Sequence, residues 1–503
     1  LVKCISGVYT PDEGTIQIEG QTCGSMTPIE AMNHGIQVIY QDLSLFQHMT
    51  VAENIAISKL KFENTKIINW KTIKAIAKEQ LDKIGVTMDL DETVGEISMA
   101  NKQMVAICRA LAQNAKILFM DEPTTALTKT EVSHLMKVML ELKKKEGFEY
   151  IACINADYST NYMPGDVNRY IYYGSIGKLL PCFVALGKES HVGSAFNAFD
   201  PNLLIAEVTR RMSLNTDLCD VAQGEVTIPP ISLKQADTKE GYTVQTALTA
   251  FSYYNFFTHG MSPDVVLEKS RQVGVEAFDS VVSYLNQQYE KYCALSGVPY
   301  TKLPWKTRVY TWKEFYAEAA AQHGQPFRDA IAAFAEKLQR EQPAMDLRYF
   351  SLAVTEEVWK WYEDKSPALV LFFGSVFSAR IEMTGKTAKE RALLDAVEGA
   401  VEKIRPEAQR QIKTRMFYPY ISDSSFMAVC DDTLAIQALE TNMPQYGVKY
   451  THPVDKIRQI DVPVVNIGTF GRDGHMLTER VDMRQTFQNV PNITYEAVKR
   501  LLS

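Results

Sequence analysis

The chain has 503 residues, of which 46% are hydrophobic and 22% are charged, a composition typical of globular proteins. Its length exceeds what one compact core usually holds, so we expect two or three domains. The formal net charge of −7 excludes a strongly basic protein, and we expect no nucleic-acid partner.

The cysteines and the apolar runs narrow the class of protein further. Eight cysteines occur without a C-x-x-C pair, which favours reduced thiols over a disulfide framework or a zinc knuckle. The longest apolar run, ALVLFFGSVF at 368–377, is well short of the roughly 18 residues that a spanning helix needs, and it predicts a buried strand. The opening LVKCISGVYTPDEG has no signal-peptide pattern, so we expect a cytoplasmic protein.

Two adjacent carboxylates close an apolar run in AKILFMDEPTTAL at 115–127. A buried strand that ends in Asp121 and Glu122 is how phosphate-transfer enzymes place a magnesium ligand beside a residue that orients water. Alone this indicates little, because many strands end in polar turns. Two blocks upstream strengthen the interpretation: IQVIYQDLSLFQHMTVAENI at 36–55 and VGEISMANKQMVAICRAL at 94–111.

Together these blocks resemble the ATP-binding cassette ATPases, and more narrowly the first cassette of the tandem ATPases in ribose- and galactose-type sugar importers. The resemblance covers about residues 1–147. It implies that Gln41 senses magnesium and attacking water, and that Ser98 in ISMAN meets ATP held by the opposite subunit. It also implies that Asp121 is the magnesium aspartate and Glu122 the catalytic glutamate. Mg-ATP would be the cofactor, and the importer's membrane subunits would be partners.

Two parts of that family's ATPase site are not found. The phosphate loop G-x-x-x-x-G-K-[ST], whose backbone N–H groups and lysine hold the phosphates, does not occur in the 503 residues. The opening at Leu1 looks cut, and we expect the loop to belong just ahead of it. The strand after Lys143–Glu146 should carry a switch histidine and has Asp157 instead. We therefore expect weak ATP binding and no ATP hydrolysis.

A second pattern of strands and loops begins near Tyr150. Residues 170–190 alternate glycine and apolar positions, which predicts an antiparallel sheet. His191 follows a Gly-Lys-Glu-Ser turn and precedes a helix expected from about Asn202 to Met212. A lone histidine at a turn is more often structural than functional.

Several ordered blocks in this second part resemble the aminoacylase and carboxypeptidase type di-zinc metallopeptidases, in particular the RocB-type arginine utilisation branch. They include GSIGK and LGKESHVG within 174–193, NLLIAEVTRRM, and VVNIGTFGRDGHMLTERV. The resemblance covers about residues 148–503. It implies zinc, with Asp157 and His475 as metal ligands. It also implies a homodimer formed through a lid domain, in which His191 reaches across to the substrate carbonyl.

The same family has further metal-site residues ahead of the position matched by Asp157: a His-x-Asp motif, a bridging aspartate and a Glu-Glu pair. This chain has cassette sequence there. A pair of zinc ions needs about five protein ligands, so Asp157 and His475 alone are expected to be solvated polar residues at strand ends. The resemblance further matches Glu479, an acid after the last ligand, and SDSSF at 422–426, a loop near the active site.

The predicted fold class is α/β. We expect a partial P-loop NTPase cassette at 1–147, fused to a partial zinc-peptidase-like α/β domain at 148–170 and 350–503. This second domain carries an α+β lid and dimerisation domain at 171–349.

The two patterns meet near Lys143–Glu149, where Gly147 is a natural helix C-cap. We interpret the chain as a fusion of two truncated proteins in which neither activity is intact. Natural recombination and misassembly of sequence data both fit this junction. One alternative is a functional zinc-dependent amidohydrolase or peptidase of amino-acid derivatives, although useful fusions normally join complete domains. The other is a dimerisation module without catalysis.

Overall fold

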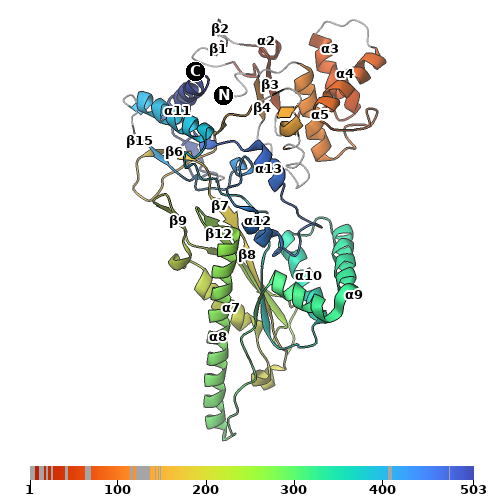
Figure 1. Cartoon of the computed structure of the whole chain (residues 1–503), viewed down its shortest axis with the longest axis vertical. Coiled ribbons are helices and arrows are strands. Elements are labelled where there is room, and N and C mark those ends of the chain that lie inside the picture. Colours follow the sequence, from red (N-terminus) through yellow and green to blue (C-terminus); the bar gives the residue numbers. More distant parts are fainter. Residues whose placement is uncertain are drawn as a thin grey trace. The chain divides into compact units, whose positions relative to one another are not determined.

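The computed structural model divides into two compact units, each of which mixes helices and strands (Figure 1). Unit 1 comprises Leu1–Tyr150 and Pro453–Ile460, and unit 2 comprises Ile151–His452 and Asp461–Ser503. The residues that the structure describes are 6–10, 16–18, 21–23, 26–39, 43–62, 69–113, 117–120, 136, 138–141, 143–144, 147, 149–405, 410–474 and 476–503.

Among its described residues, unit 1 contains two two-stranded sheets and five helices with known bounds, and residues 136, 138–141 and 143–144 are also helical. Strands β1 and β2 form an antiparallel hairpin, and β3 and β4 pair in parallel from Ile36↔Ile117 to Ile39↔Met120. The elements are β1 (Ile16–Ile18), β2 (Gln21–Cys23), α2 (Pro28–Asn33), β3 (Ile36–Ile39), α3 (Val51–Phe62), α4 (Trp70–Lys83), α5 (Met99–Ala112), β4 (Ile117–Met120) and α13 (Val454–Ile460).

Local sequence explains where α2 begins. Thr27 Oγ1 accepts a hydrogen bond from Glu30 N at 3.3 Å, and the Glu30 carboxylate accepts one from Thr27 N at 2.7 Å. Pro28 occupies the first turn, where a missing N–H costs nothing. This capping box satisfies backbone donors that the first turn leaves unpaired.

The larger sheet of unit 2 has six strands in the order β11-β12-β8-β14-β13, with β7 paired to β12. Neighbouring strands are antiparallel except for the parallel pair β13 and β14. Every residue of β8 and β14 is buried, so the predicted buried strand within 368–377 is confirmed. The strands are β7 (Gly177–Leu179), β8 (Pro181–Leu186), β11 (Ile231–Asp237), β12 (Thr249–Thr258), β13 (Val309–Thr311) and β14 (Ala368–Phe373).

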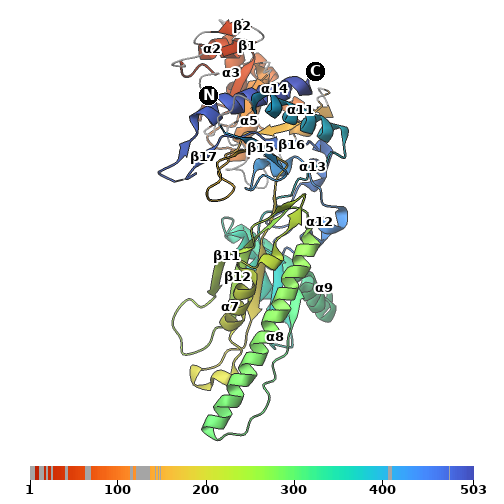
Figure 2. The same cartoon turned by 90° about the vertical axis from the view of Figure 1, so that its left-hand side faces the viewer.

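Helices cover both faces of this sheet, which explains the burial of its central strands. On one face, α9 (Trp312–Glu341) and α10 (Leu347–Trp361) enclose a core that includes Val184, Phe315 and Val370. On the other lie α7 (Pro201–Met212) and α8 (Pro263–Ser296) (Figures 1 and 2). The helix predicted at 202–212 is thereby confirmed as α7.

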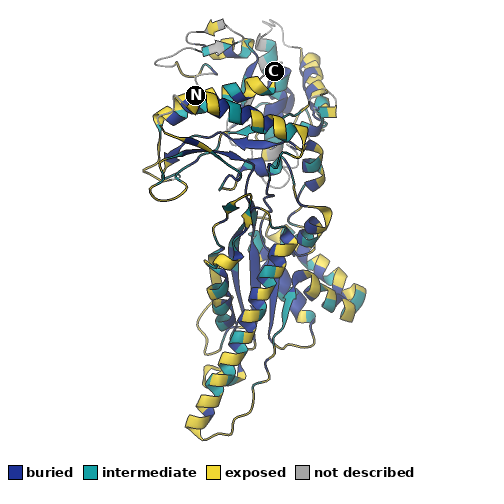
Figure 3. Cartoon of the chain, turned by 60° about the vertical axis from the view of Figure 1, so that its left-hand side comes forward, coloured by how far each residue is buried: buried dark blue, intermediate teal, exposed yellow. Residues whose placement is uncertain are grey.

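Helix α8 approaches the sheet closely at Gly274. A Cβ at this position would lie 3.1 Å from Leu369, 3.2 Å from Phe183 and 3.3 Å from Val309. Figure 3 shows that α8 is buried along its first part and exposed toward its C-terminal end. A larger residue at 274 would push the helix away from the core.

The smaller sheet of unit 2 has the order β15-β6-β16-β5. The outer pairs β15–β6 and β16–β5 are parallel, and the central pair β16–β6 is antiparallel. Residues of α11 and α14 pack on Ile171 and Val465 of this sheet. The elements are β5 (Cys153–Asn155), β6 (Arg169–Tyr173), α11 (Ala388–Ile404), β15 (Ile412–Arg415), β16 (Val464–Asn466) and α14 (Val490–Leu501).

Each described sheet takes all its strands from one unit. Within the described ranges, no helix is both long and apolar enough to span a membrane. The remaining elements of unit 2 are η1 (Val192–Asn197), η2 (Thr216–Leu218), β9 (Val221–Ala222), β10 (Glu225–Val226), η4 (Asp423–Phe426), α12 (Thr433–Glu440), β17 (Gly471–Arg472), β18 (Arg480–Val481) and η5 (Gln485–Asn489).

Candidate functional site

The predicted nucleotide residues of unit 1 are placed only in part. Gln41, Asp121 and Glu122 lie outside the described residues. Gln41 comes two residues after β3 and Asp121 directly after β4. Because the two strands are parallel, the chain leaves both of them at the same edge of the sheet.

Ser98 serves as the N-cap of α5. Its Oγ accepts a hydrogen bond from Asn101 N at 3.2 Å, and the residue is exposed. A serine in this position satisfies one of the unpaired donors of the first turn. The described contacts of Ser98 therefore have a structural explanation within α5.

The predicted metal ligand Asp157 lies where β5 and β16 end side by side. The Asp157 backbone N–H donates to Asn466 Oδ1 at 2.8 Å, and Asn466 Nδ2 donates to Asp157 O at 3.1 Å. The two segments run so close that a Cβ at Gly468 would lie 1.6 Å from Asp157 O. Only glycine fits there, and the strand ends are held together.

The side chain of Asp157 faces its own backbone and a tyrosine. Its Oδ1 accepts from Tyr158 N at 2.9 Å. Burial, followed by the negative charge of Asp157, raises the pKa of Tyr418. The Tyr418 hydroxyl donates to Tyr158 O at 2.6 Å. We call this group of residues, Asn155, Asp157, Tyr418, Ser422 and Asn466, the strand-end corner.

The SDSSF loop at 422–426 lies beside this corner. Asn155 Nδ2 donates to Ser422 Oγ at 3.0 Å and to Asn466 Oδ1 at 2.9 Å. The motifs of the sequence assign no role to Asn155 or Asn466. The signal available was that two apolar strands, CIN and VVN, each end in asparagine.

The second predicted ligand, His475, lies outside the described residues. Its neighbour Gly474 is placed against the Tyr158 ring, where a Cβ would lie 3.3 Å from ring carbons. Glu479 is exposed. Across the part of the chain that the structure describes, no group of three or more His, Cys, Asp and Glu side chains could hold a metal ion.

His191 is exposed on a loop beside the larger sheet. It is the N-cap of η1, and its Nδ1 accepts from Gly193 N at 3.1 Å. The flanking bonds Val192 N to Val244 O and Thr246 N to Ser190 O fix the loop against residues 244–246. Among the described residues, no hydrogen bond or ring contact joins His191 to the strand-end corner.

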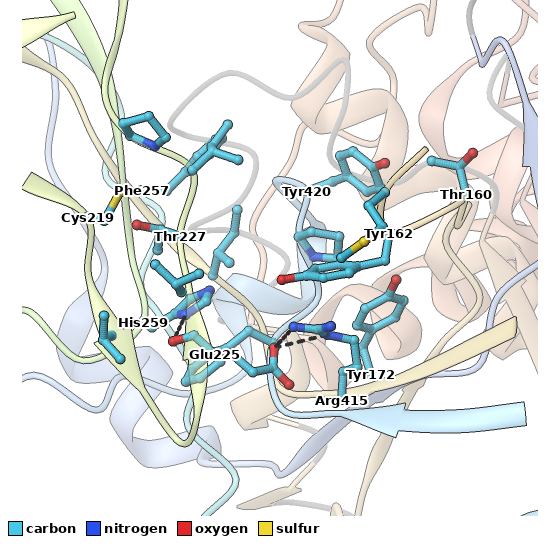
Figure 4. Close-up of a pocket in the computed structure, with 18 of the residues that line it drawn as sticks. Thr160, Tyr162, Tyr172, Cys219, Glu225, Thr227, Phe257, His259, Arg415 and Tyr420 are labelled. Carbon is cyan, nitrogen blue, oxygen red and sulfur yellow. Dashed lines mark hydrogen bonds and ion pairs between the residues drawn. The ribbon is translucent and has the colours of Figure 1, made fainter. Parts of the chain in front are cut away.

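A cavity of about 690 Å³ adjoins the strand-end corner within unit 2. Tyr172 on its wall makes an edge-on contact with Tyr418, with ring centroids 5.6 Å apart. Figure 4 shows side chains from separate segments of unit 2 converging on it: residues 160–163, 172–176, 216–229, 257–259 and 415–420. Such a volume is typical of sites for small molecules.

An ion pair lies on one wall of the cavity (Figure 4). The Arg415 Nε and a terminal guanidinium nitrogen lie 3.3 and 3.1 Å from Glu225 Oε2. Glu225 Oε1 accepts from Met416 N at 2.7 Å, and the Arg415 guanidinium lies 3.6 Å from the Tyr162 ring centroid. Both charges are thus neutralised within the protein.

His259 lies on the opposite side of Glu225. Its ring stacks on Phe417 with centroids 4.0 Å apart and an interplanar angle of 5°. Burial lowers the pKa of His259. The backbone N–H groups of His259, Gly260 and Met261 donate to Asp220 Oδ2 at 2.7, 2.7 and 2.6 Å, which fixes the turn after β12.

The motifs likewise assign no role to His259, Glu225 or Arg415. The only local signal is a polar Thr-His pair that interrupts the apolar end of β12 in NFFTHG. Glu225 and Arg415 are 190 positions apart, and nothing local marks them as partners.

Comparisons with known proteins match the chain to two different families, over stretches that overlap because their shares of the chain, 77% and 29%, together exceed its length. Residues 1–125 match the family described as ABC transporter. The Bacillus subtilis ribose import ATP-binding protein RbsA is 41% identical over 144 residues, 29% of this chain and 29% of RbsA. Protein RocB of Bacillus subtilis is 30% identical over 386 residues, 77% of this chain and 67% of RocB. A solved ATP-binding cassette in its ADP conformation is 25% identical over 29% of this chain and 60% of its own, with a TM-score of 0.25.

Proposed function

The chain belongs to the RocB family over most of its length and is fused to an ABC transporter ATPase-like part, and from this premise we propose that neither parent activity is intact. By family, the parent of the larger part is a metal-dependent hydrolase of an amino-acid derivative in arginine catabolism. By family, the parent of the smaller part hydrolyses ATP for sugar import.

One observation carries the proposal for the larger part. The residues ahead of Asp157, where the di-zinc metallopeptidases have their His-x-Asp motif, bridging aspartate and Glu-Glu pair, are ABC transporter sequence through residue 125. Asp157 and His475 remain as the proposed ligands. A co-catalytic zinc pair needs a bridging carboxylate and a glutamate base in addition.

The donor set around Asp157 does not fit a pair of zinc ions. Its Oδ1 already accepts from Tyr158 N, and its other described partners are the Asn466 amide and the Tyr418 hydroxyl. Asn466 is joined in turn to Asn155, which donates to Ser422. Amides and hydroxyls are poor zinc ligands compared with histidine, cysteine and carboxylate. We therefore derive no hydrolytic step through zinc in this chain.

For the smaller part, we propose weak Mg-ATP binding and no turnover. Gln41, Ser98, Asp121 and Glu122 are the proposed nucleotide residues, and Glu122 would be a vestigial base. The 503 residues hold no G-x-x-x-x-G-K-[ST] loop to bind the phosphates. Association with importer membrane subunits is likewise a proposal from the family.

A zinc and activity assay on the 503-residue chain tests the main proposal. After dialysis, elemental analysis should find less than one zinc per chain, and N-acyl amino acids and dipeptides should not be cleaved, with an aminoacylase as positive control. Two zinc ions per chain that are both lost in His475→Ala would contradict the proposal. Magnesium-dependent ATP hydrolysis that disappears in Glu122→Gln would contradict its second half.

A homodimer through the proposed lid at 171–349 is a second candidate function, with His191 as its proposed cross-subunit residue. The distal part of α8 favours it, because Tyr284, Tyr292 and Leu295 expose 50, 51 and 89% of their surface. Clustered exposed apolar residues mark interaction sites. Light scattering after size exclusion should give the mass of a dimer, and a Leu295→Glu, Tyr284→Glu variant should give that of a monomer.

A further inference from the structure

The cavity beside the strand-end corner is electrically neutral although it contains a full ion pair. Glu225 has both carboxylate oxygens engaged, one by Met416 N and the other by Arg415. The Arg415 guanidinium is further covered by the Tyr162 ring. A charged ligand would have to separate this pair, and breaking a largely buried pair is costly. The cavity therefore favours an uncharged ligand.

The His259 imidazole presents one hydrogen-bond acceptor to the cavity. Its Nδ1 lies 3.4 Å from the backbone oxygen of Glu225, which can only accept, so the contact assigns the proton to Nδ1. Nε2 then carries a lone pair, and it has no hydrogen-bond partner among the described residues. The charged groups that face the ring are Asp220, Glu225 and Arg415. Burial favours the neutral ring, so Nε2 accepts at neutral pH.

Most of the remaining wall is apolar or aromatic. Phe257, Phe417 and Tyr172 contribute ring surfaces, and shorter apolar side chains fill the gaps between them: Met163, Ile176, Val226, Ile228, Pro229 and Pro419. Aromatic and aliphatic walls with few polar groups are typical of sites that bind flat apolar molecules. The lining also has polar groups, among them the Asn161 amide and the hydroxyls of Thr216 and Tyr420. The His259 ring is the acceptor that stacking on Phe417 holds in a fixed orientation, so it selects for a donor on the ligand.

From these contacts we propose that the cavity binds an uncharged aromatic molecule that donates one hydrogen bond to His259 Nε2. The ligand class is that of phenols, with the ring held among the aromatic side chains and the O–H directed at the imidazole. This site uses no metal and no nucleotide. It therefore goes beyond the proposed function and does not depend on it.

A matched pair of probes tests the proposal on the full chain. The probes are 2-naphthol and 2-methoxynaphthalene, which have the same ring system, but only 2-naphthol has an O–H to donate. Both are titrated by fluorescence at neutral pH in the presence of EDTA. We expect saturable binding of both, with 2-naphthol tighter by about 3- to 10-fold, which is the effect of one neutral hydrogen bond.

Two variants connect the binding to the cavity and to His259. His259→Phe keeps an aromatic ring against Phe417 and removes the acceptor, so it should bind both probes equally. Ile228→Trp adds bulk to the cavity wall and should weaken both probes by at least about tenfold. Leu233→Trp is the matched control, because Leu233 is exposed to a similar degree (55 against 59%) and does not line the cavity.

Each contrary result overturns a named step. No saturable binding of either probe would refute the site itself. Equal affinities in the unchanged chain would refute the role of His259, even if His259→Phe does not fold. Equal effects of Ile228→Trp and Leu233→Trp would place binding outside the cavity. Binding that is absent in EDTA but present in a parallel titration without EDTA would make the site metal-dependent and contradict the proposal.

Discussion

Unit 1 is the more similar of the two units to its relative in sequence, whereas unit 2 has the larger described sheets. The part that matches the ribose importer ATPase is 41% identical to it, yet the described sheets of unit 1 have only two strands each. The part that matches RocB is 30% identical, and unit 2 contains sheets of six and four strands. Sequence identity compares residues one by one, whereas the size of a sheet depends on how many segments pair as strands.

The difference also appears in the cores. Unit 1 has a three-residue core of Met26, Ala31 and Ile36, and a further group of buried apolar residues in α3, α4 and α5 that includes Ile55 and Val105. In unit 2, α9 and α10 close over a core that contains Phe315, Phe350 and many further apolar side chains. A larger core buries more apolar surface, so we expect unit 2 to be the more stable unit.

The largest expected effect is that of a charge placed in either core. Val370→Asp puts a carboxylate into fully buried β14 and should destabilise unit 2 by more than about 4 kcal/mol. Val105→Asp, at an equally buried position of α5, is the counterpart in unit 1. Hydrogen exchange should show loss of protection in the mutated unit alone. Loss of protection throughout the chain in both variants would show that the units fold as one.

Breaking a buried ion pair of unit 2 should have the next largest effect. The Arg380 guanidinium donates to the Asp431 carboxylate, and their side chains are 9 and 1% exposed. Asp431→Ala removes the buried carboxylate that pairs with the Arg380 charge. It should lower the free energy of unfolding, measured by chemical denaturation, by about 3 to 5 kcal/mol. The control is Arg210→Ala, which breaks a pair with Glu207 at a 67% exposed arginine and should cost less than about 1 kcal/mol. Similar costs for the two would contradict the burial argument.

A buried histidine should make the stability of unit 2 depend on pH. His452 Nδ1 lies 3.0 Å from the Tyr450 hydroxyl, its Nε2 is buried without a partner among the described residues, and burial lowers its pKa to about 4. The folded state keeps the His452 ring neutral. The stability that depends on the neutral ring is therefore complete at pH values above the pKa of histidine in the unfolded chain, near 6.5. It is lost as pH falls from there toward about 4, by up to about 3 kcal/mol.

His452→Gln should flatten that pH dependence when free energies of unfolding are measured between pH 7 and 4. His48→Gln, at an exposed position of unit 1, should leave it unchanged. Equal pH slopes in the unchanged chain and in His452→Gln would remove His452 as the cause.

The smallest expected effects come from helix caps, and they should be alike in the two units. Ser98→Ala in unit 1 and Thr387→Ala in unit 2 each remove the hydroxyl that caps a helix, α5 and α11 respectively. Each should cost about 1 kcal/mol in its own unit. A much larger cost for Ser98→Ala would indicate that Ser98 has contacts beyond its helix.

Short-range features of this protein were determined by its sequence. The helix at 201–212, the buried strand at 368–373 and the cap of α2 follow from neighbouring residues, because apolar periodicity and capping act over a few positions. The order of motifs was also enough to separate the two families. The proposed roles of Gln41, Asp121, Glu122 and His475 still stand on those motifs alone.

The cavity and the strand-end corner were decided only by tertiary structure. Asp157 meets Asn466 across 309 positions, and Glu225 meets Arg415 across 190. These contacts depend on strand register and on which strands become neighbours in the sheet. A register shift of one residue would turn each side chain to the opposite face, and no local pattern in the sequence fixes it.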